Sequence, residues 1–277
     1  MIDLTQLPVV DVHCHPFLNR GPLTAEEFTN LASFGGGSQR FMEDGGVTFN
    51  ENVRAELQRV KRDTVYFRRM VHDLARFFGV EPDLETVLAR RNRDIETDYR
   101  DYVTRLFADA GVATLLFDFG YPMPQFSIDE VTAELPVEVV PIFRIEPLIA
   151  DLLKTDIGWS DFRQQFDDTI AEALQTGGFR GVKSIIAYRT GLDISPLSRT
   201  PDQGYQALDA IRRGLGGGSM KKLRDHLLCR ALELCMEYDV PMQIHTGMGD
   251  FEVNLVYARP AYLMDLLRFP TFRSCQV

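Results

Sequence analysis

The stretch VVDVHCH, residues 9–15, decides the fold. Its apolar, β-branched residues predict a strand over 8–15. Because successive side chains of a strand point to opposite faces, Asp11, His13 and His15 share one face. Two imidazoles at i and i+2 near the carboxyl end of a strand can bind one metal ion, and zinc-type ions accept neutral nitrogen ligands of this kind. The rival interpretation is that both histidines are ordinary polar residues at a strand end.

Four further apolar runs predict strands over residues 113–120, 137–146, 179–189 and 240–247. Helical periodicity over 161–176 and 220–238 separates the later strands. This alternation of strand and helix predicts an α/β fold with a parallel sheet. With 277 residues and 45% hydrophobic content, the chain is near the usual size of one (β/α)8 barrel domain.

Residues 16–110, between the first two predicted strands, are far more than a βα loop needs. They contain helical segments over 24–32, 52–78 and 83–108, so we interpret them as a helical insertion that serves as a lid. The glycines at 35–37 and 45–46 predict flexible joints within it. A second long connection, 190–218, ends in a glycine run that lacks the Lys-Ser/Thr ending of a P-loop, and we interpret that run as a plain hinge or turn.

A second chemical signal is the stretch PMQIHTGMG, which places His245 at the carboxyl end of the fifth predicted strand. In a barrel this end is the active-site mouth, where His13 and His15 would also lie. A lone histidine at a strand end is as often structural as it is a ligand. Taken together, the two signals predict a metal tripod of His13, His15 and His245.

The segments VVDVHCH, GFRGVKSIIAYRTGL and VPMQIHTGMGD together resemble the amidohydrolase superfamily, its amidohydrolase-2 branch, and within it the FluG-like amidohydrolases. The resemblance runs from near residue 8 to near residue 273. It implies a (β/α)8 barrel of the TIM type with one divalent metal, most often Zn2+, that activates water. It also implies that a glutamine-synthetase-like domain can follow in the full-length gene.

The family pattern continues with a histidine on the sixth strand and a catalytic aspartate on the eighth. Only about five of the eight strands can be placed before residue 277, so we expect a C-terminally truncated barrel whose catalytic aspartate lies beyond that residue. An open sheet would leave an unpaired strand edge, which makes a homo-oligomer a reasonable expectation.

Several polar residues near strand ends are candidates for substrate binding: Arg189, Tyr188, Glu146 and Asp118. The planar fork of Arg189 suits a substrate carboxylate. Structural ion pairing competes with this role for Arg189, Glu146 and Asp118. For Lys183 we favour pairing with Asp11 or Glu146 over carboxylation and metal bridging, because the predicted strand runs some way past it.

Two further histidines, His72 and His226, fall on predicted helices among basic residues, and we expect both to face solvent. The four cysteines have no paired CxxC spacing and are expected to be reduced thiols. A formal charge of −10 disfavours nucleic acid and anionic membrane partners. The N-terminus has no signal-peptide pattern and no apolar run is long enough to span a bilayer, so we expect a cytoplasmic protein that acts on a small molecule.

These features predict a metal-dependent hydrolase that cleaves a non-peptide carbon–nitrogen (amide) bond of a small, carboxylate-bearing substrate. A nonoxidative decarboxylase with the same metal tripod is the first alternative. The second alternative is a truncated barrel remnant without catalytic activity.

Overall fold

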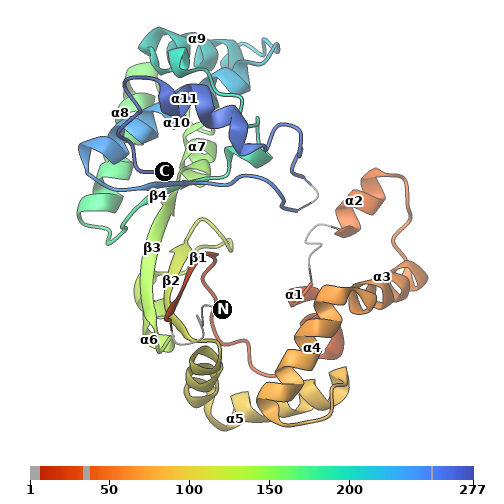
Figure 1. Ribbon diagram of the computed structural model, residues 1–277. Coiled ribbons are helices and arrows are strands. Elements are labelled where there is room, and N and C mark those ends of the chain that lie inside the picture. The colour runs from red at the N-terminus through yellow and green to blue at the C-terminus, as the bar shows by residue number, and fades with distance from the viewer. Residues whose placement is uncertain (1–6, 34–37, 251) are drawn as a thin grey trace. The chain divides into compact units, whose positions relative to one another are not determined.

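The computed structural model describes residues 7–33, 38–250 and 252–277 (Figure 1). The chain divides into two compact units. The first comprises Met1–Asp11, Phe17–Thr114 and Asp129–Glu138, and the second comprises Val12–Pro16, Leu115–Ile128 and Val139–Val277. The predicted glycine joint at 35–37 lies outside the described residues.

Five strands form one sheet in the order β1-β2-β3-β4-β5. They are β1 (Val9–Cys14), β2 (Val112–Asp118), β3 (Glu138–Arg144), β4 (Val182–Ser184) and β5 (Met242–Ile244). Strand β4 runs parallel to both β3 and β5. The α/β class and all five predicted strands are therefore confirmed, and the sequential strand order is consistent with part of a (β/α)8 barrel.

Strands β3, β4 and β5 are shorter than the sequence predicts. Strand β4 ends at Ser184 and a 3-10 turn, Ile186–Tyr188, follows it. Glu146 explains this end, because its carboxylate accepts hydrogen bonds from Ser184 Oγ (2.7 Å) and from the Ile185 backbone N–H (2.8 Å). Glu146 itself lies in the first turn of helix α7 (Ile145–Leu152), where the following proline is tolerated, and not on the strand.

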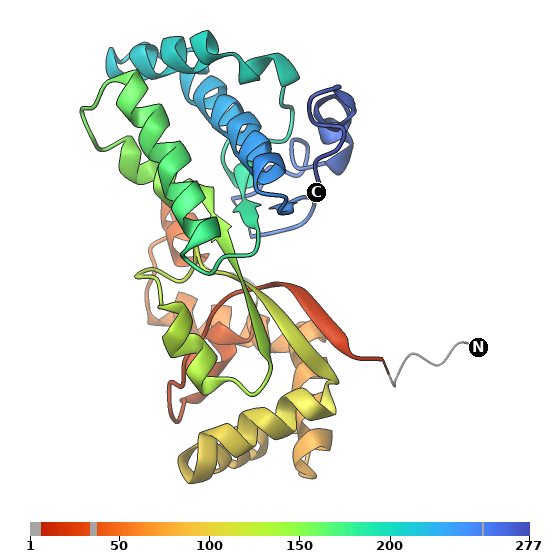
Figure 2. The ribbon, with the colours of Figure 1, turned by 90° about the vertical axis from the view of Figure 1, so that its left-hand side faces the viewer.

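The second unit carries most of the helices that flank the sheet. The predicted segments 161–176 and 220–238 are α8 (Trp159–Gln175) and α10 (Ser219–Glu237), which lie side by side (Figure 2). The 190–218 connection holds an unpredicted helix, α9 (Pro201–Arg212). The remaining elements are the 3-10 turns Pro196–Arg199 and Pro260–Leu263, and α11 (Met264–Arg268).

Apolar residues from these helices form the core of the second unit. Phe162, Phe166 and Ile170 of α8 are fully buried, as are Leu223 and Leu227 of α10. Within each helix these residues are four positions apart, a spacing that places them on one face of the helix. Burial of each large side chain contributes roughly 1.5–3 kcal/mol to folding.

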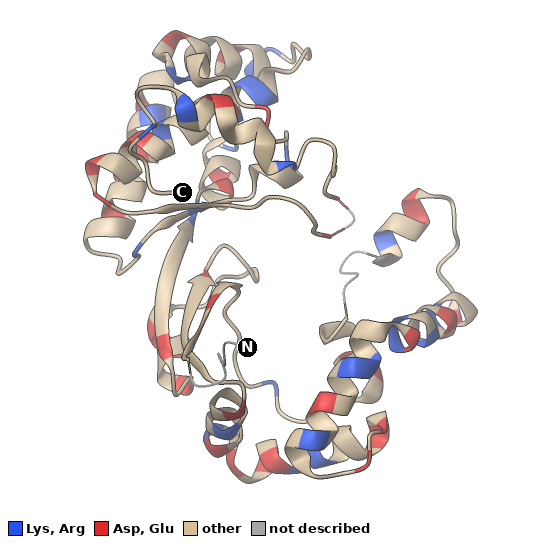
Figure 3. Ribbon diagram, in the orientation of Figure 1, with Lys and Arg blue, Asp and Glu red and all other residues tan. Residues whose placement is uncertain are grey.

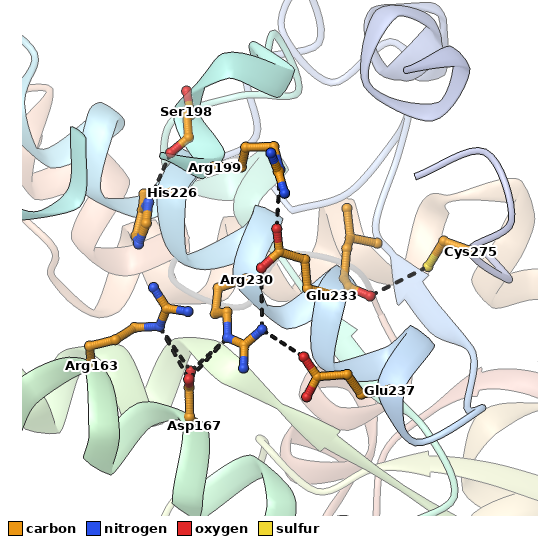
Figure 4. A network of polar contacts seen from close by, with 10 residues as sticks. Arg163, Asp167, Ser198, Arg199, His226, Arg230, Glu233, Glu237 and Cys275 are labelled. Atoms are coloured by element: carbon orange, nitrogen blue, oxygen red, sulfur yellow. Dashed lines mark hydrogen bonds and ion pairs between the residues drawn. The ribbon is translucent and has the colours of Figure 1, made fainter. Parts of the chain in front are cut away.

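A polar network links α8 to α10 at the edge of this core (Figure 4). Asp167 of α8 accepts hydrogen bonds from Arg163 (3.1 Å) and from Arg230 of α10 (3.0 Å). Arg230 also pairs with Glu233 (3.2 Å) and Glu237 (2.9 Å) of its own helix. The charged face of α10 is thus held against α8 by ion pairs of defined geometry.

His226 was expected to face solvent, and this prediction is wrong. The residue is 0% exposed, its Nδ1 lies 2.8 Å from the Ser198 carbonyl oxygen, and its ring packs 5.3 Å from Trp159. Gly204 of α9 makes this burial possible, since a Cβ there would collide with both rings. His72, by contrast, is exposed as predicted.

The first unit is mainly helical. Its helices are α1 (Ala25–Leu31), α2 (Ser38–Asp44), α3 (Glu51–Asp63), α4 (Val65–Phe78) and α5 (Leu84–Asp109), and the short α6 (Ile128–Glu134) begins at its border. The predicted segment 52–78 divides at Thr64, whose hydroxyl accepts a hydrogen bond from Phe67 N–H and so caps α4. Acidic and basic residues are interspersed along these helices (Figure 3), with ion pairs such as Arg69–Asp73 at 2.8 Å. A role as lid stays a prediction.

In the part of the chain that the structure describes, every helix is too short or too polar to cross a membrane.

Candidate metal centre

Two of the three predicted ligands face each other in the second unit. His13 lies on β1, and His245 follows the last residue of β5, where its backbone N–H donates to Ser184 O (3.0 Å). The ring centroids of His13 and His245 are 5.3 Å apart with an interplanar angle of 82°. Two histidines 232 positions apart in the sequence are therefore neighbours at the carboxyl ends of their strands, as the barrel hypothesis requires.

The third predicted ligand, His15, comes directly after β1. Its Nδ1 lies 3.2 Å from the backbone carbonyl oxygen of Asp118, and its ring meets that of Tyr121 edge-on at 5.3 Å. When Nδ1 carries the proton, it donates to this carbonyl and Nε2 keeps its lone pair. A backbone carbonyl that orients a histidine in this way is a common feature of metal sites.

All three imidazoles have pKa values below the ordinary value. Burial, followed by the charge of Lys183, lowers the pKa of His13 to about 4. Burial also lowers the pKa of His15, although the charge of Asp118 acts in the opposite direction. The pKa of His245 is lowered by burial and by the charge of Lys183. Neutral imidazole is the form that binds metal, so at neutral pH none of the three has to lose a proton first.

Lys183 of β4 lies among these histidines and is 0% exposed. Its ammonium group donates a hydrogen bond to Gln243 Oε1 and lies 3.5 Å from His13 Nε2. Burial lowers the pKa of Lys183 to about 8. Of the two predicted partners of Lys183, Glu146 contacts Ser184 and Ile185 instead, and pairing with Asp11 stays a prediction. The short β4 places Lys183 next to the strand end rather than well below it.

The donor set fits a zinc-type ion, because three neutral imidazoles from two strands are its usual protein ligands. The three histidine side chains are not arranged to bind one ion together. Among the described residues, no three His, Cys, Asp or Glu side chains are grouped to hold one ion, and His245 Nε2 lies 3.1 Å from the Met248 carbonyl oxygen. Ligation by all three would therefore need the His245 ring to leave this carbonyl or to bind through Nδ1.

Asp118 and Arg144 form a buried ion pair beside His15. Arg144 Nε lies 3.0 Å from Oδ1 and 2.9 Å from Oδ2 of Asp118, and the side chains are 10% and 1% exposed. The Asp118 carboxylate also accepts a hydrogen bond from the Gly120 N–H (2.9 Å). For Asp118 the geometry favours the ion-pairing interpretation over direct contact with substrate.

The other predicted substrate residues lie around the turn after β4. The Tyr188 ring packs 4.6 Å from that of His245, and its hydroxyl accepts a hydrogen bond from the Asp250 N–H (3.1 Å). Arg189 is exposed. Both were predicted to lie near the end of the strand, but β4 ends at Ser184. Tyr188 is the last residue of the 3-10 turn that follows, and Arg189 comes directly after it.

Gln243 is a residue of this centre that the sequence reasoning missed. Its amide nitrogen donates to Val12 O on β1 and its amide oxygen accepts from Lys183. It precedes His245 by two residues, so strand alternation alone places both on one face of β5. That signal was present in the sequence.

Comparison with known proteins supports the fold. No protein-family model matches the chain. The chain is 27% identical over 239 residues to Protein fluG of Emericella nidulans, an alignment that covers 74% of this chain and 27% of that protein. It is similar to a crystal structure of a Lactobacillus casei ATCC 334 protein proposed to be a metal-dependent hydrolase, with a TM-score of 0.74, 22% identity, and coverage of 98% of this chain and 66% of the other.

These matches agree with the expected resemblance to FluG-like proteins and show that the chain has the fold of the Lactobacillus protein. The chain spans about a quarter of the length of its curated relative and about two thirds of the solved structure.

Proposed function

We propose that the chain is a metal-dependent hydrolase of the amidohydrolase type, which cleaves a non-peptide carbon–nitrogen bond of a small, carboxylate-bearing substrate. The observation that carries this proposal is the approach of His13 and His245 from β1 and β5, with His15 oriented by a backbone carbonyl. The similarity to a proposed metal-dependent hydrolase supports it.

His13, His15 and His245 would hold the ion, for which we propose Zn2+. When bound, such an ion lowers the pKa of a water molecule and polarises the bond to be cleaved. The residues of the chain keep the imidazoles neutral and fix the tautomer of His15 through the Asp118 carbonyl. The Arg144–Asp118 ion pair holds that carbonyl in place from the neighbouring strand.

Metal analysis of the purified chain tests the proposal. We expect about one zinc or similar ion per chain by inductively coupled plasma mass spectrometry, and loss of that ion in a His13→Ala/His15→Ala double variant. His72→Ala is the matched control, because this histidine is exposed on α4 and should leave the metal content unchanged. Equal metal content in the double variant and the wild type would contradict the proposed site.

The reaction type is tested by the product. A hydrolase acting on an amide releases ammonia or an amine, whereas a decarboxylase with the same ligands releases carbon dioxide. If a panel of small carboxylated amides and acids yields carbon dioxide and no amine, the reaction is decarboxylation and the proposed amide hydrolysis is wrong.

A further inference from the structure

A pocket of about 400 Å³ opens in the second unit beside the turn that follows β4. Residues from β3, α7, the turn and α10 line it, and four of them are cationic: Arg144, Lys154, Arg189 and Arg224. Two acidic residues, Glu146 and Asp151, also line it, so the lining is net positive when all six are ionised, although the formal charge of the chain is −10. The pocket therefore has a charge preference of its own.

Two of the four cations already have partners. Arg144 pairs with Asp118, and Lys154 pairs with Asp151 at 2.6 Å. The guanidinium groups of Arg189 and Arg224 make no hydrogen bond or ion pair within the described residues. The pocket thus holds two guanidinium groups whose donors are unused.

Glu146 is the remaining acidic residue of the pocket without an ion-pair partner. Its Oε1 atom is committed to Ser184 and Ile185, and its Oε2 atom is buried without a hydrogen-bond partner among the described residues. The lining residues without an ion-pair partner are therefore one carboxylate and two guanidinium groups, with a formal charge of +1 when all three are ionised.

Arg224 is half-buried, and its pKa is lowered by that burial and by the charge of Arg189, against the opposing effect of Glu146. Holding two like charges in a partly desolvated pocket costs free energy unless an anion joins them. A guanidinium presents a planar fork of donors that matches a carboxylate. A single carboxylate would balance the charge of the pocket.

We propose that Arg189 and Arg224 together bind the carboxylate of the substrate, a proposal that rests on the proposed hydrolase function for the identity of its ligand. Arg224 of α10 is then a specificity-determining residue, and the substrate is an amide of a small acid whose carboxylate lies away from the bond that is cleaved. Tyr188 precedes Arg189 and packs on His245, so the turn connects this subsite to the candidate metal centre.

Isothermal titration calorimetry with glutarate, and with its neutral counterpart glutaramide, tests the proposal on the full chain. We expect binding of glutarate and not of glutaramide, and a loss of about tenfold or more in glutarate affinity in Arg189→Gln and in Arg224→Gln, since a hydrogen bond to a charged group contributes roughly 1.5–3 kcal/mol. Lys222→Gln is the matched control, because Lys222 is exposed on the same helix and does not line the pocket.

Arg189→Gln removes an exposed side chain that has no hydrogen-bond or ion-pair partner among the described residues, so it should fold even if Arg224→Gln does not; circular dichroism checks both. Undiminished glutarate binding in Arg189→Gln, equal binding of glutaramide, or no binding of glutarate to the wild type would each overturn the proposal.

The same samples separate this proposal from the proposed function. If the chain binds no metal but binds glutarate in a way that depends on the arginines, the result supports the carboxylate subsite and contradicts the proposed metal-dependent hydrolase. If the histidines bind metal but the chain does not bind glutarate, the result supports the proposed hydrolase and contradicts the carboxylate subsite.

Discussion

Arg144 on β3 contacts both carboxylate oxygens of Asp118 at the end of β2, and Gly120 provides the space for this contact. A Cβ at Gly120 would collide with the Arg144 side chain. The backbone carbonyl of Asp118 faces His15. One ion pair between neighbouring strands thus fixes the residue that orients a candidate ligand.

Removing one member of the Asp118–Arg144 ion pair should lower the free energy of unfolding substantially. Asp118→Ala leaves a largely buried guanidinium without a counter-charge, and we expect a loss of about 3–5 kcal/mol in the free energy of unfolding. Urea denaturation measures it. The double variant Asp118→Leu/Arg144→Met should lose much less, because it leaves no unpaired charge; equal losses in the single and double variants would contradict this explanation.

Gly204→Ala should destabilise the second unit by about 1–3 kcal/mol, because the added Cβ would collide with Trp159 and His226 in a packed core. Gly216→Ala is the control. It adds the same methyl group at a position with nothing within 4 Å, and its unfolding midpoint should stay within error of the wild type. A neutral Gly204→Ala would show that α9 can move away from α10 at no cost.

The unfolding free energy should fall as the pH rises through the range 4 to 6 because of Asp225. Burial raises the pKa of this carboxyl from its ordinary 3.8 to about 6 in the folded chain. The folded state therefore keeps a proton that the unfolded state has lost, and the associated stability is complete below pH 3.8 and absent above pH 6.

For Asp225, which is 5% exposed, the shift corresponds to about 3 kcal/mol. Asp225→Asn should remove this pH dependence and stabilise the chain at pH 7 relative to the wild type. Denaturation series at pH 4, 5, 6 and 7 compare the two. If the unfolding free energy of the variant changes with pH as steeply as that of the wild type, other groups cause the pH dependence.

The His13 ring should titrate near pH 4 in the folded chain, which nuclear magnetic resonance of the imidazole protons can follow. Since unfolded His13 takes up a proton near pH 6.5, its contribution to stability is present above that pH and is lost as the pH falls toward 4. Lys183→Met removes a charge that lowers this pKa and should move the midpoint upward. A midpoint that stays in place would mean that Lys183 does not act on His13.

The sequence was sufficient to locate β1, β5, α8 and α10, because period-2 and period-3.6 patterns report directly which faces are buried. The adjacency of His13 and His245 also followed from the rule that parallel strands present their carboxyl ends together. The metal tripod of His13, His15 and His245 stays a prediction, because among the described residues no three such side chains are grouped to hold one ion.

Other features depend on contacts between distant residues. Strand β4 stops early because Glu146, 38 positions before Ser184, takes the hydrogen bonds of that segment. His226 is buried because a glycine on another helix leaves room for its ring. Patterns within one segment carry no information about such partners, so the length of β4 and the burial of His226 could not be predicted.

Because β4 ends early, the predicted strand 179–189 consists of two parts that can evolve separately. Lys183 lies on the sheet, where its neighbours on β1 and β5 restrict it. Tyr188 is the last residue of the 3-10 turn Ile186–Tyr188 and Arg189 follows it, so both lie past the register pairs that join β4 to β5. Substitutions or insertions in that turn would alter the proposed carboxylate subsite while the histidine strands remain unchanged, so we expect relatives with different ligands to differ first between residues 185 and 195.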